Sequence, residues 1–132
     1  MEVNRDDVVA EVHAVFADYE KALVAGDWAA VSGLFWESRH TVRFGIADAQ
    51  AGAAQLRAWR YAQPPLPAGR RLTDTRVTTF GTDLAVVTTR FSYPDGGRDG
   101  GPVGRQSQTW VRFPEGWRIV SAHVSHPVHV PQ

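Results

Sequence analysis

The sequence contains no cysteine, and Lys21 is the single lysine among its fourteen basic residues. Without cysteine there is no disulfide framework, no thiolate nucleophile and no cysteine-ligated zinc. Fourteen acidic residues balance the fourteen basic ones, so the formal net charge is zero. This balance argues against a nucleic acid as the main partner, because phosphate binding needs a one-sided basic surface.

The sequence also lacks long apolar runs. None approaches the roughly 18 residues that a membrane span requires, and residues 1–7 are acidic where a signal peptide is basic. We therefore expect a cytoplasmic protein without membrane association. A length of 132 residues with 43% hydrophobic residues predicts a single domain over residues 1–132, with enough apolar side chains for a core.

Three helices are expected in the first half of the chain. In residues 4–25 the apolar side chains recur at three- and four-residue steps, which is typical of an amphipathic helix, and Asn4 can cap it. Asp27 can cap a short second helix over residues 28–35. A third helix is expected over residues 53–60, where a proline-rich loop follows it.

Strands dominate the second half. Residues 72–80 and 84–93 predict one hairpin, and residues 104–113 and 117–125 predict another, each joined by a short glycine-containing turn. A short strand is also expected over residues 40–45. Helices followed by long antiparallel strands predict an α+β fold, with the helices packed on one face of a curved sheet.

Five motifs occur in order along most of the chain. They are Phe-Trp at 35–36, His-Thr-Val-Arg-Phe-Gly at 40–45, Thr-Thr-Phe-Gly-Thr-Asp at 78–83, Gly-Arg-Gln-Ser-Gln-Thr-Trp-Val-Arg at 104–112 and Gly-Trp-Arg-Ile-Val-Ser-Ala-His-Val-Ser at 116–125. Together they resemble the AtzH-like (HpxZ) family of the SnoaL-like, nuclear-transport-factor-2-like superfamily. The resemblance implies a ketosteroid-isomerase-like cone, in which a curved antiparallel sheet wraps a long amino-terminal helix and leaves a pocket.

The resemblance also implies an enzyme of nitrogen catabolism that needs no metal or cofactor. The AtzH member cleaves an N-carboxylate from a small carboxylated urea, 1,3-dicarboxyurea, to give allophanate, beside an amidase that makes this substrate. The residues that match the family's proposed functional pair are Tyr19 and Arg43. A homodimer and a functional link to an amidase are expected on the same ground.

Two segments depart from the family pattern. The family shows an acidic residue, an amide and an aromatic residue before the glycine that opens the third helix, whereas residues 46–52 contain no aromatic residue. The loop over residues 61–69 is longer and richer in proline than expected. Both segments are placed where they can line the pocket mouth, so they bear on substrate identity.

The residues themselves give Tyr19 and Arg43 two interpretations each. Tyr19 lies on the apolar stripe of the first helix, where periodicity alone indicates a core tyrosine and the resemblance indicates a proton donor. Arg43 shares a strand face with Thr41, and its paired donors suit a substrate carboxylate. An inward arginine needs a carboxylate or an anion beside it, and Glu37 or Asp48 is the expected partner.

Further candidates for substrate binding come from the motifs and the last strands. Arg105 and Ser107 share one face of their strand while glutamines share the other, so parity leaves the inward face open. His123 is either a pocket residue of the last strand or a structural histidine. His40 begins its strand or supports Arg43. The predicted set is Arg105, Ser107, His123, Trp36 and His40.

Other basic residues receive no functional role. His126 and His129 are three residues apart in a proline-rich tail without helix, so no metal site is predicted. Six arginines are interpreted as the bias of a GC-rich genome toward arginine: Arg5, Arg57, Arg60, Arg70, Arg71 and Arg118.

Two alternatives to the cleavage of a carboxylated urea stay open. A ketosteroid-isomerase-like proton-transfer enzyme needs a pocket carboxylate as its base, and Asp48 is the acidic residue placed for that role. A non-catalytic ligand-binding protein, or an accessory subunit associated with an amidase, uses the same fold.

Overall fold

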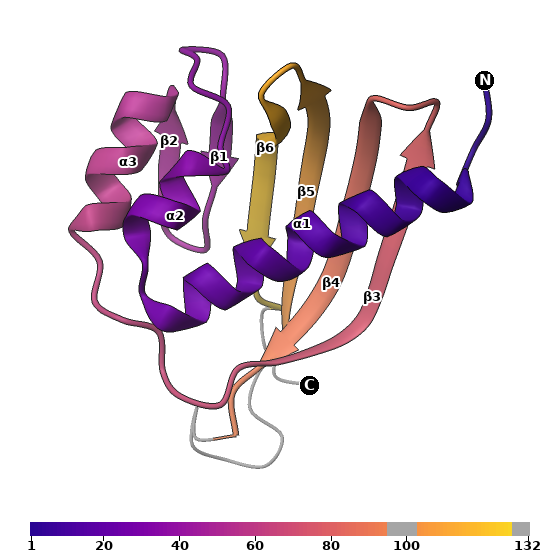
Figure 1. The fold of residues 1–132 in the computed structure, drawn as a ribbon. Helices are drawn as coiled ribbons and strands as arrows, with labels where there is room; N and C mark the ends of the chain where they lie inside the picture. The colour runs from indigo at the N-terminus through magenta and orange to yellow at the C-terminus, as the bar shows by residue number, and fades with distance from the viewer. Residues whose placement is uncertain (95–102, 128–132) are drawn as a thin grey trace.

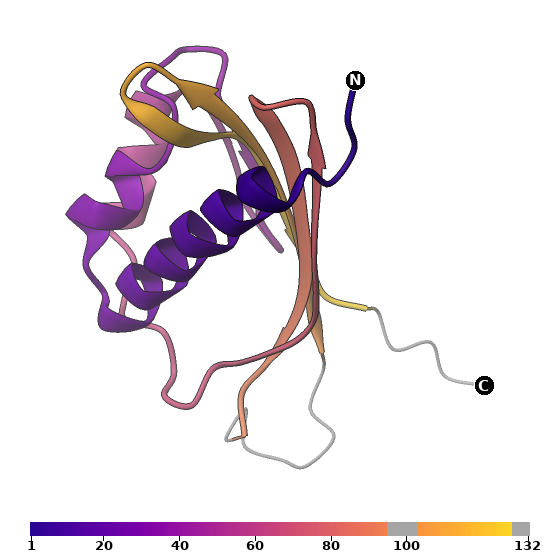
Figure 2. The same ribbon diagram turned by 45° about the vertical axis from the view of Figure 1, so that its right-hand side comes forward.

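A long first helix crosses the concave face of a six-stranded sheet in the computed structural model, which describes residues 1–94 and 103–127 (Figure 1). Three helices pack on one side of the sheet, as Figure 2 shows. The predicted α+β fold with a curved sheet around an amino-terminal helix is confirmed. The helices are α1 (Asp6–Ala25), α2 (Trp28–Gly33) and α3 (Ala53–Tyr61). None of those described is long and apolar enough to cross a membrane.

The sheet has the strand order β2-β1-β6-β5-β4-β3, in which β1 is parallel to β6 and the other neighbours are antiparallel. The sequence did not predict β2, because a three-residue strand with the sequence Ala-Gln-Ala carries no β-rich pattern. The strands are β1 (Val42–Phe44), β2 (Ala49–Ala51), β3 (Arg71–Phe80), β4 (Leu84–Ser92), β5 (Gly104–Phe113) and β6 (Gly116–Ser125).

The core lies between α1 and the concave face of the sheet. The predicted apolar stripe of α1 is buried, and it packs against side chains of β4, β5 and β6. Trp110 is fully buried there, and its indole Nε1 donates a hydrogen bond to Gln108 Oε1 at 3.0 Å. Burial of one large apolar side chain stabilises a fold by about 1.5–3 kcal/mol. This packing therefore fixes the face of α1 that carries Tyr19.

The start of α1 differs from the prediction. Asn4 does not cap the helix: Arg5 occupies the N-cap position, with no hydrogen bond from its side chain to the helix backbone. Asn4 instead pairs with β3. Its backbone N–H donates to Thr79 O and its side-chain Oδ1 accepts from Thr79 N, both at 2.9 Å. The predicted cap of α2 is confirmed, because Asp27 Oδ1 accepts from Ala30 N at 3.1 Å.

Candidate active site

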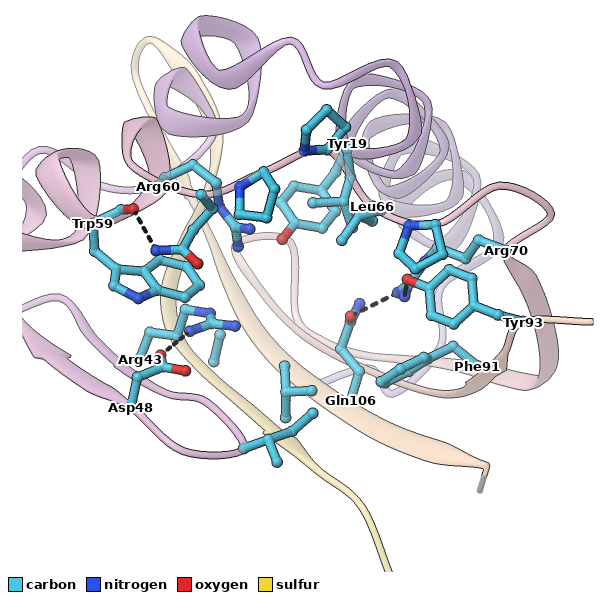
Figure 3. A pocket seen from close by; sticks show the side chains of 18 of the residues that line it. Tyr19, Arg43, Asp48, Trp59, Arg60, Leu66, Arg70, Phe91, Tyr93 and Gln106 are labelled. Atoms are coloured by element: carbon cyan, nitrogen blue, oxygen red, sulfur yellow. Dashed lines mark hydrogen bonds and ion pairs between the residues drawn. The ribbon is translucent and has the colours of Figure 1, made fainter. Parts of the chain in front are cut away.

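A cavity of about 340 Å³ lies among α1, α3, the proline-rich loop and the concave face of the sheet (Figure 3). The loop contributes residues 63–67, and the turn between β1 and β2 contributes Ile46 and Asp48. Both segments that depart from the family pattern therefore line the cavity, as expected. Its other polar lining residues include Tyr19 and three arginines, Arg43, Arg60 and Arg70.

Arg43 projects from β1 and is buried, with 8% of its surface exposed. Its Nη1 donates to Asp48 Oδ1 at 2.7 Å and to Gln50 Oε1 at 3.2 Å. Gln50 Nε2 in turn donates to Asp48 Oδ1 at 2.8 Å. The guanidinium also lies over the Trp59 ring, 4.4 Å from its centroid. The segment without the family's aromatic residue thus supplies the two polar side chains that orient Arg43.

Of the two expected partners of Arg43, the structure selects Asp48. Glu37 lies elsewhere and pairs with the exposed Arg57 of α3, whose Nη1 is 2.7 Å from Glu37 Oε2. Both carboxylates are near Arg43 in the sequence, so the sequence alone did not show which of them pairs with it. The tight turn after β1 does, because the Gly45 amide donates to Asp48 O at 2.8 Å and holds Asp48 beside the strand.

Arg70, at the other end of the cavity, has partners for each of its donor nitrogens. Its Nε donates to Glu20 Oε1 at 2.8 Å, its Nη1 to Tyr93 Oη at 3.0 Å and its Nη2 to Gln106 Oε1 at 3.0 Å. The guanidinium lies over Phe91, 4.4 Å from the ring centroid. Burial acts to lower the pKa of Arg70, but the hydrogen bond and charge of Glu20 outweigh it and raise the pKa. The charge of Arg70 is therefore compensated within the fold.

Arg60, on α3, has no such compensation. Only 6% of its surface is exposed, and among residues 1–94 and 103–127 its guanidinium has neither a hydrogen bond nor an ion pair (Figure 3). Its contacts are the rings of Trp59 and Trp28, at 4.5 and 5.3 Å from the centroids. Burial lowers the pKa of Arg60; Tyr19 and the charge of Asp48 oppose this shift, and the charges of Arg43 and Arg70 add to it. An uncompensated cation therefore faces the cavity.

Tyr19 lies between the Arg70 end of the cavity and the end formed by Arg43 and Arg60, with its hydroxyl directed into the cavity (Figure 3). Its ring is held edge-to-face by Phe35 and Trp110, at centroid distances of 6.2 and 6.3 Å. In the described part of the chain its hydroxyl has no hydrogen-bond partner. Burial raises the pKa of Tyr19, and Arg60 is the strongest opposing influence. The hydroxyl is thus a protonated donor available to a ligand.

Three of the predicted substrate-binding residues point away from the cavity. Arg105 and Ser107 are exposed on the outer face of β5, because the buried residues of that strand are the alternating ones, Gln106 and Gln108. His123 of β6 is exposed on the same outer face. The prediction that these three residues face the cavity is wrong. Alternation along β5 had not shown which of its two faces is buried.

Trp36 and His40 also lie outside the cavity. His40 is exposed, and Trp36 stacks between His40 and Phe113, at centroid distances of 6.2 and 5.4 Å. Contrary to the prediction, neither residue lines the cavity. His129 lies outside the described residues, within which no cluster of three or more metal-ligating side chains occurs.

The sequence interpretation missed Arg60 and Arg70, which it assigned to genome composition. A signal for Arg60 existed: Ala53, Leu56 and Arg60 are the buried residues of α3, and their spacing places them on one helix face. No comparable signal existed for Arg70, whose partner Glu20 is 50 residues away in the chain.

The curved sheet around a long first helix, with a cavity on the concave side, defines a nuclear-transport-factor-2-like protein. The structure superimposes on an NTF2-like protein of unknown function from Pseudomonas putida with a TM-score of 0.79, at 17% identity, over 96% of this chain and 91% of that one. That likeness shows the fold. Residues 1–128 match the AtzH-like family, and the chain belongs to that family.

Two solved structures share much more sequence with the chain. A protein of unknown function from Pectobacterium atrosepticum is 46% identical, with a TM-score of 0.88 over 96% of this chain and 95% of that one. A cystatin-like fold protein from Burkholderia xenovorans is 49% identical, with a TM-score of 0.89 over 98% of this chain and 99% of that one. A search of proteins with curated functions found no match.

Proposed function

We propose that this chain removes an N-carboxylate from a carboxylated urea, converting 1,3-dicarboxyurea to allophanate and carbon dioxide. Membership of the AtzH-like family and the nuclear-transport-factor-2-like fold support a small enzyme-like or ligand-binding protein. The observation that carries the finer proposal is the composition of the cavity. Two buried arginines, Arg43 and Arg60, and the hydroxyl of Tyr19 line one small space.

The arginines supply what a carboxylated urea needs for binding. Guanidinium groups hold carboxylates through parallel charge-assisted hydrogen bonds, which are strongest where water is excluded. Arg43 uses Nη1 for Asp48 and Gln50, and its other donor nitrogens have no partner among the described residues. Arg60 contributes a full charge that has no counterion among residues 1–94 and 103–127. Together they orient a small carboxylate relative to Tyr19.

Tyr19 supplies the proton in the proposed reaction. The C–N bond to the leaving carboxylate breaks, its electron pair goes to the nitrogen, and carbon dioxide departs. The nitrogen takes one proton from the Tyr19 hydroxyl, which regains a proton from water. The dianion and one proton thus give the allophanate monoanion and carbon dioxide. The raised pKa of Tyr19 keeps the hydroxyl protonated for this role.

The ketosteroid-isomerase-like alternative depends on Asp48, which lines the cavity. A base for proton abstraction needs a carboxylate oxygen within reach of the substrate. Asp48 Oδ1 already accepts hydrogen bonds from Arg43 and Gln50, at 2.7 and 2.8 Å. Oδ1 therefore serves to orient Arg43, while Oδ2 has no hydrogen-bond partner among the described residues.

The test is the rate of allophanate formation from 1,3-dicarboxyurea generated in the assay, with a protein-free blank. We expect the wild type to exceed the blank and Tyr19→Phe to lose about 10²–10⁴-fold in rate, the usual contribution of a general acid. Tyr61→Phe is the matched control, because Tyr61 is 54% exposed and outside the cavity. A wild-type rate equal to the blank would contradict the proposed function, and unchanged turnover in Arg43→Ala would contradict the role of Arg43.

A further inference from the structure

The charges around the cavity are unevenly compensated. Three arginines line it, and two of them have carboxylate partners, Asp48 for Arg43 and Glu20 for Arg70. Arg60 has none in the described ranges, although its side chain is more than nine-tenths buried. A buried, unpaired charge is costly unless a ligand of opposite charge completes it. The cavity is therefore built to receive one negative charge at Arg60.

The Arg70 end has a different chemistry. The guanidinium donors of Arg70 are taken up by Glu20, Gln106 and Tyr93. A ligand at this end meets a cation that is already neutralised, polar groups that are already hydrogen-bonded, and the imidazole of His126, which also lines the cavity and packs on Phe91. It gains little from a second negative charge there, and an uncharged polar group fits equally well.

We propose, on the basis of the proposed function, that Arg60 binds the carboxylate that the substrate retains, and that the Arg70 end takes the carboxylate that leaves. Arg60 then supplies the uncompensated charge of the anion site, beside the donor nitrogens of Arg43 that have no partner among the described residues. The ligand class that it selects is a small monocarboxylate with an uncharged polar group at the other end.

The direction of the reaction follows from how binding affects the barrier. An interaction lowers the barrier only when it is stronger in the transition state than in the ground state. A salt bridge to the leaving carboxylate weakens as carbon dioxide forms, so it opposes the reaction. A salt bridge between Arg60 and the retained carboxylate persists throughout. Because Arg70 is already paired with Glu20, it forms no strong salt bridge that would hold back the leaving carboxylate.

Three inert probes separate charge from shape: glutarate, glutaramate and glutaramide. They have the same five-atom backbone as 1,3-dicarboxyurea and carry two, one and no carboxylates. Titration calorimetry on the wild type should show that glutaramate binds, that glutarate binds no more than a few-fold more tightly, and that glutaramide binds much more weakly. We expect Arg60→Gln to weaken glutaramate binding about 10- to 100-fold, the loss typical of a hydrogen bond to a charged group.

Two control variants guard against trivial causes. Arg57→Gln changes an exposed arginine of the same helix, outside the cavity, and should leave glutaramate affinity unchanged. Arg60→Lys keeps the charge and loses the planar fork, and it should retain part of the affinity. Circular dichroism and thermal unfolding report whether each variant is folded. A folded Arg60→Gln with wild-type glutaramate affinity would overturn the proposal.

The outcomes also separate this inference from the proposed function. Binding of glutaramate that depends on Arg60, without allophanate formation, would support the anion site and contradict the proposed reaction. Allophanate formation together with a glutaramate affinity that is unchanged in Arg60→Gln would support the proposed reaction and contradict the anion site. A wild type that does not bind glutaramate, or that binds glutarate more than about tenfold more tightly, would overturn the assignment of the two ends.

Discussion

Arg70 and Arg60 lie at opposite ends of the cavity, and among the described residues Arg70 has a carboxylate partner whereas Arg60 has none. Arg70 is surrounded by Glu20, Gln106 and Tyr93, and its pKa is raised despite burial. Arg60 stacks on Trp59 without a counterion among the described residues, and burial lowers its pKa. The contrast teaches that burial alone does not mark a functional arginine. The presence or absence of an internal partner separates a structural cation from one that faces a ligand.

Breaking the compensated end should have the largest effect on stability. Glu20→Gln leaves the Arg70 charge buried and unpaired, and loss of one member of a buried ion pair costs about 3–5 kcal/mol. We expect a decrease of this size in the free energy of unfolding, measured by urea denaturation. Combining Glu20→Gln with Arg70→Met should recover most of the loss. A single variant as stable as the wild type would show that Arg70 does not need Glu20.

Removing the uncompensated charge of Arg60 should instead increase the free energy of unfolding. Arg60→Met keeps much of the side-chain volume against Trp59 and removes a charge that has no partner in the described chain. Replacement of buried charges by apolar groups stabilises proteins by about 1–4 kcal/mol in favourable cases. We expect the ligand-free variant to melt at a higher temperature than the wild type. A lower melting temperature would indicate that Arg60 is a structural residue like Arg70.

Tyr19, which lies between Arg60 and Arg70, should make the free energy of unfolding depend on pH. In the unfolded chain tyrosine ionises near pH 10, about the pKa of a free tyrosine side chain, while the folded hydroxyl stays protonated because burial raises its pKa. The unfolded state then binds fewer protons, so stability falls as pH rises above about 10, by up to about 1.4 kcal/mol per pH unit. Unfolding measured across this range should show the loss in the wild type and not in Tyr19→Phe.

The same measurement reports on Arg60. The charges that act on Tyr19 are those of Arg60, Glu20, Arg43 and Arg70, and Arg60 is the largest of them. Because Arg60 lowers the pKa of Tyr19, Arg60→Met should raise it further and extend the loss of stability to higher pH. An unchanged profile in Arg60→Met would place the Arg60 charge too far from the hydroxyl to affect it.

The smallest effect is expected on the outer face of the sheet. Arg105 is exposed on β5 and lies outside the cavity, so Arg105→Gln should change stability by less than about 0.5 kcal/mol. Glutaramate affinity and the rate of allophanate formation should equal those of the wild type. A loss of either would restore Arg105 to substrate binding.

The sequence predicted the fold well because its apolar periodicities were clear. The stripe on the first helix and the two hairpins are where they were expected, and the pairing of Arg43 with Asp48 was one of two alternatives named. The cap at Asn4 was wrong because the residue pairs with β3 across 75 positions of sequence. A local pattern does not contain such a contact.

The site was predicted less completely than the fold. On β5, polar residues occupy both faces, so alternation did not reveal that Gln106 and Gln108 point inward and Arg105 outward. Arg60 was recoverable from its position four residues after Leu56 on the buried face of α3. The homodimer and the link to an amidase stay predictions.

The most direct measurement is a crystal structure of the protein with glutaramate bound. The central claim is that Arg60, the cavity arginine without a carboxylate partner in the described part of the chain, decides where a carboxylate lies. We predict the glutaramate carboxylate on the guanidinium of Arg60, with the Tyr19 hydroxyl facing the backbone of the ligand and the amide at the end formed by Arg70, Gln106 and Tyr93. A carboxylate bound at Arg70, with the amide at Arg60, would contradict the claim.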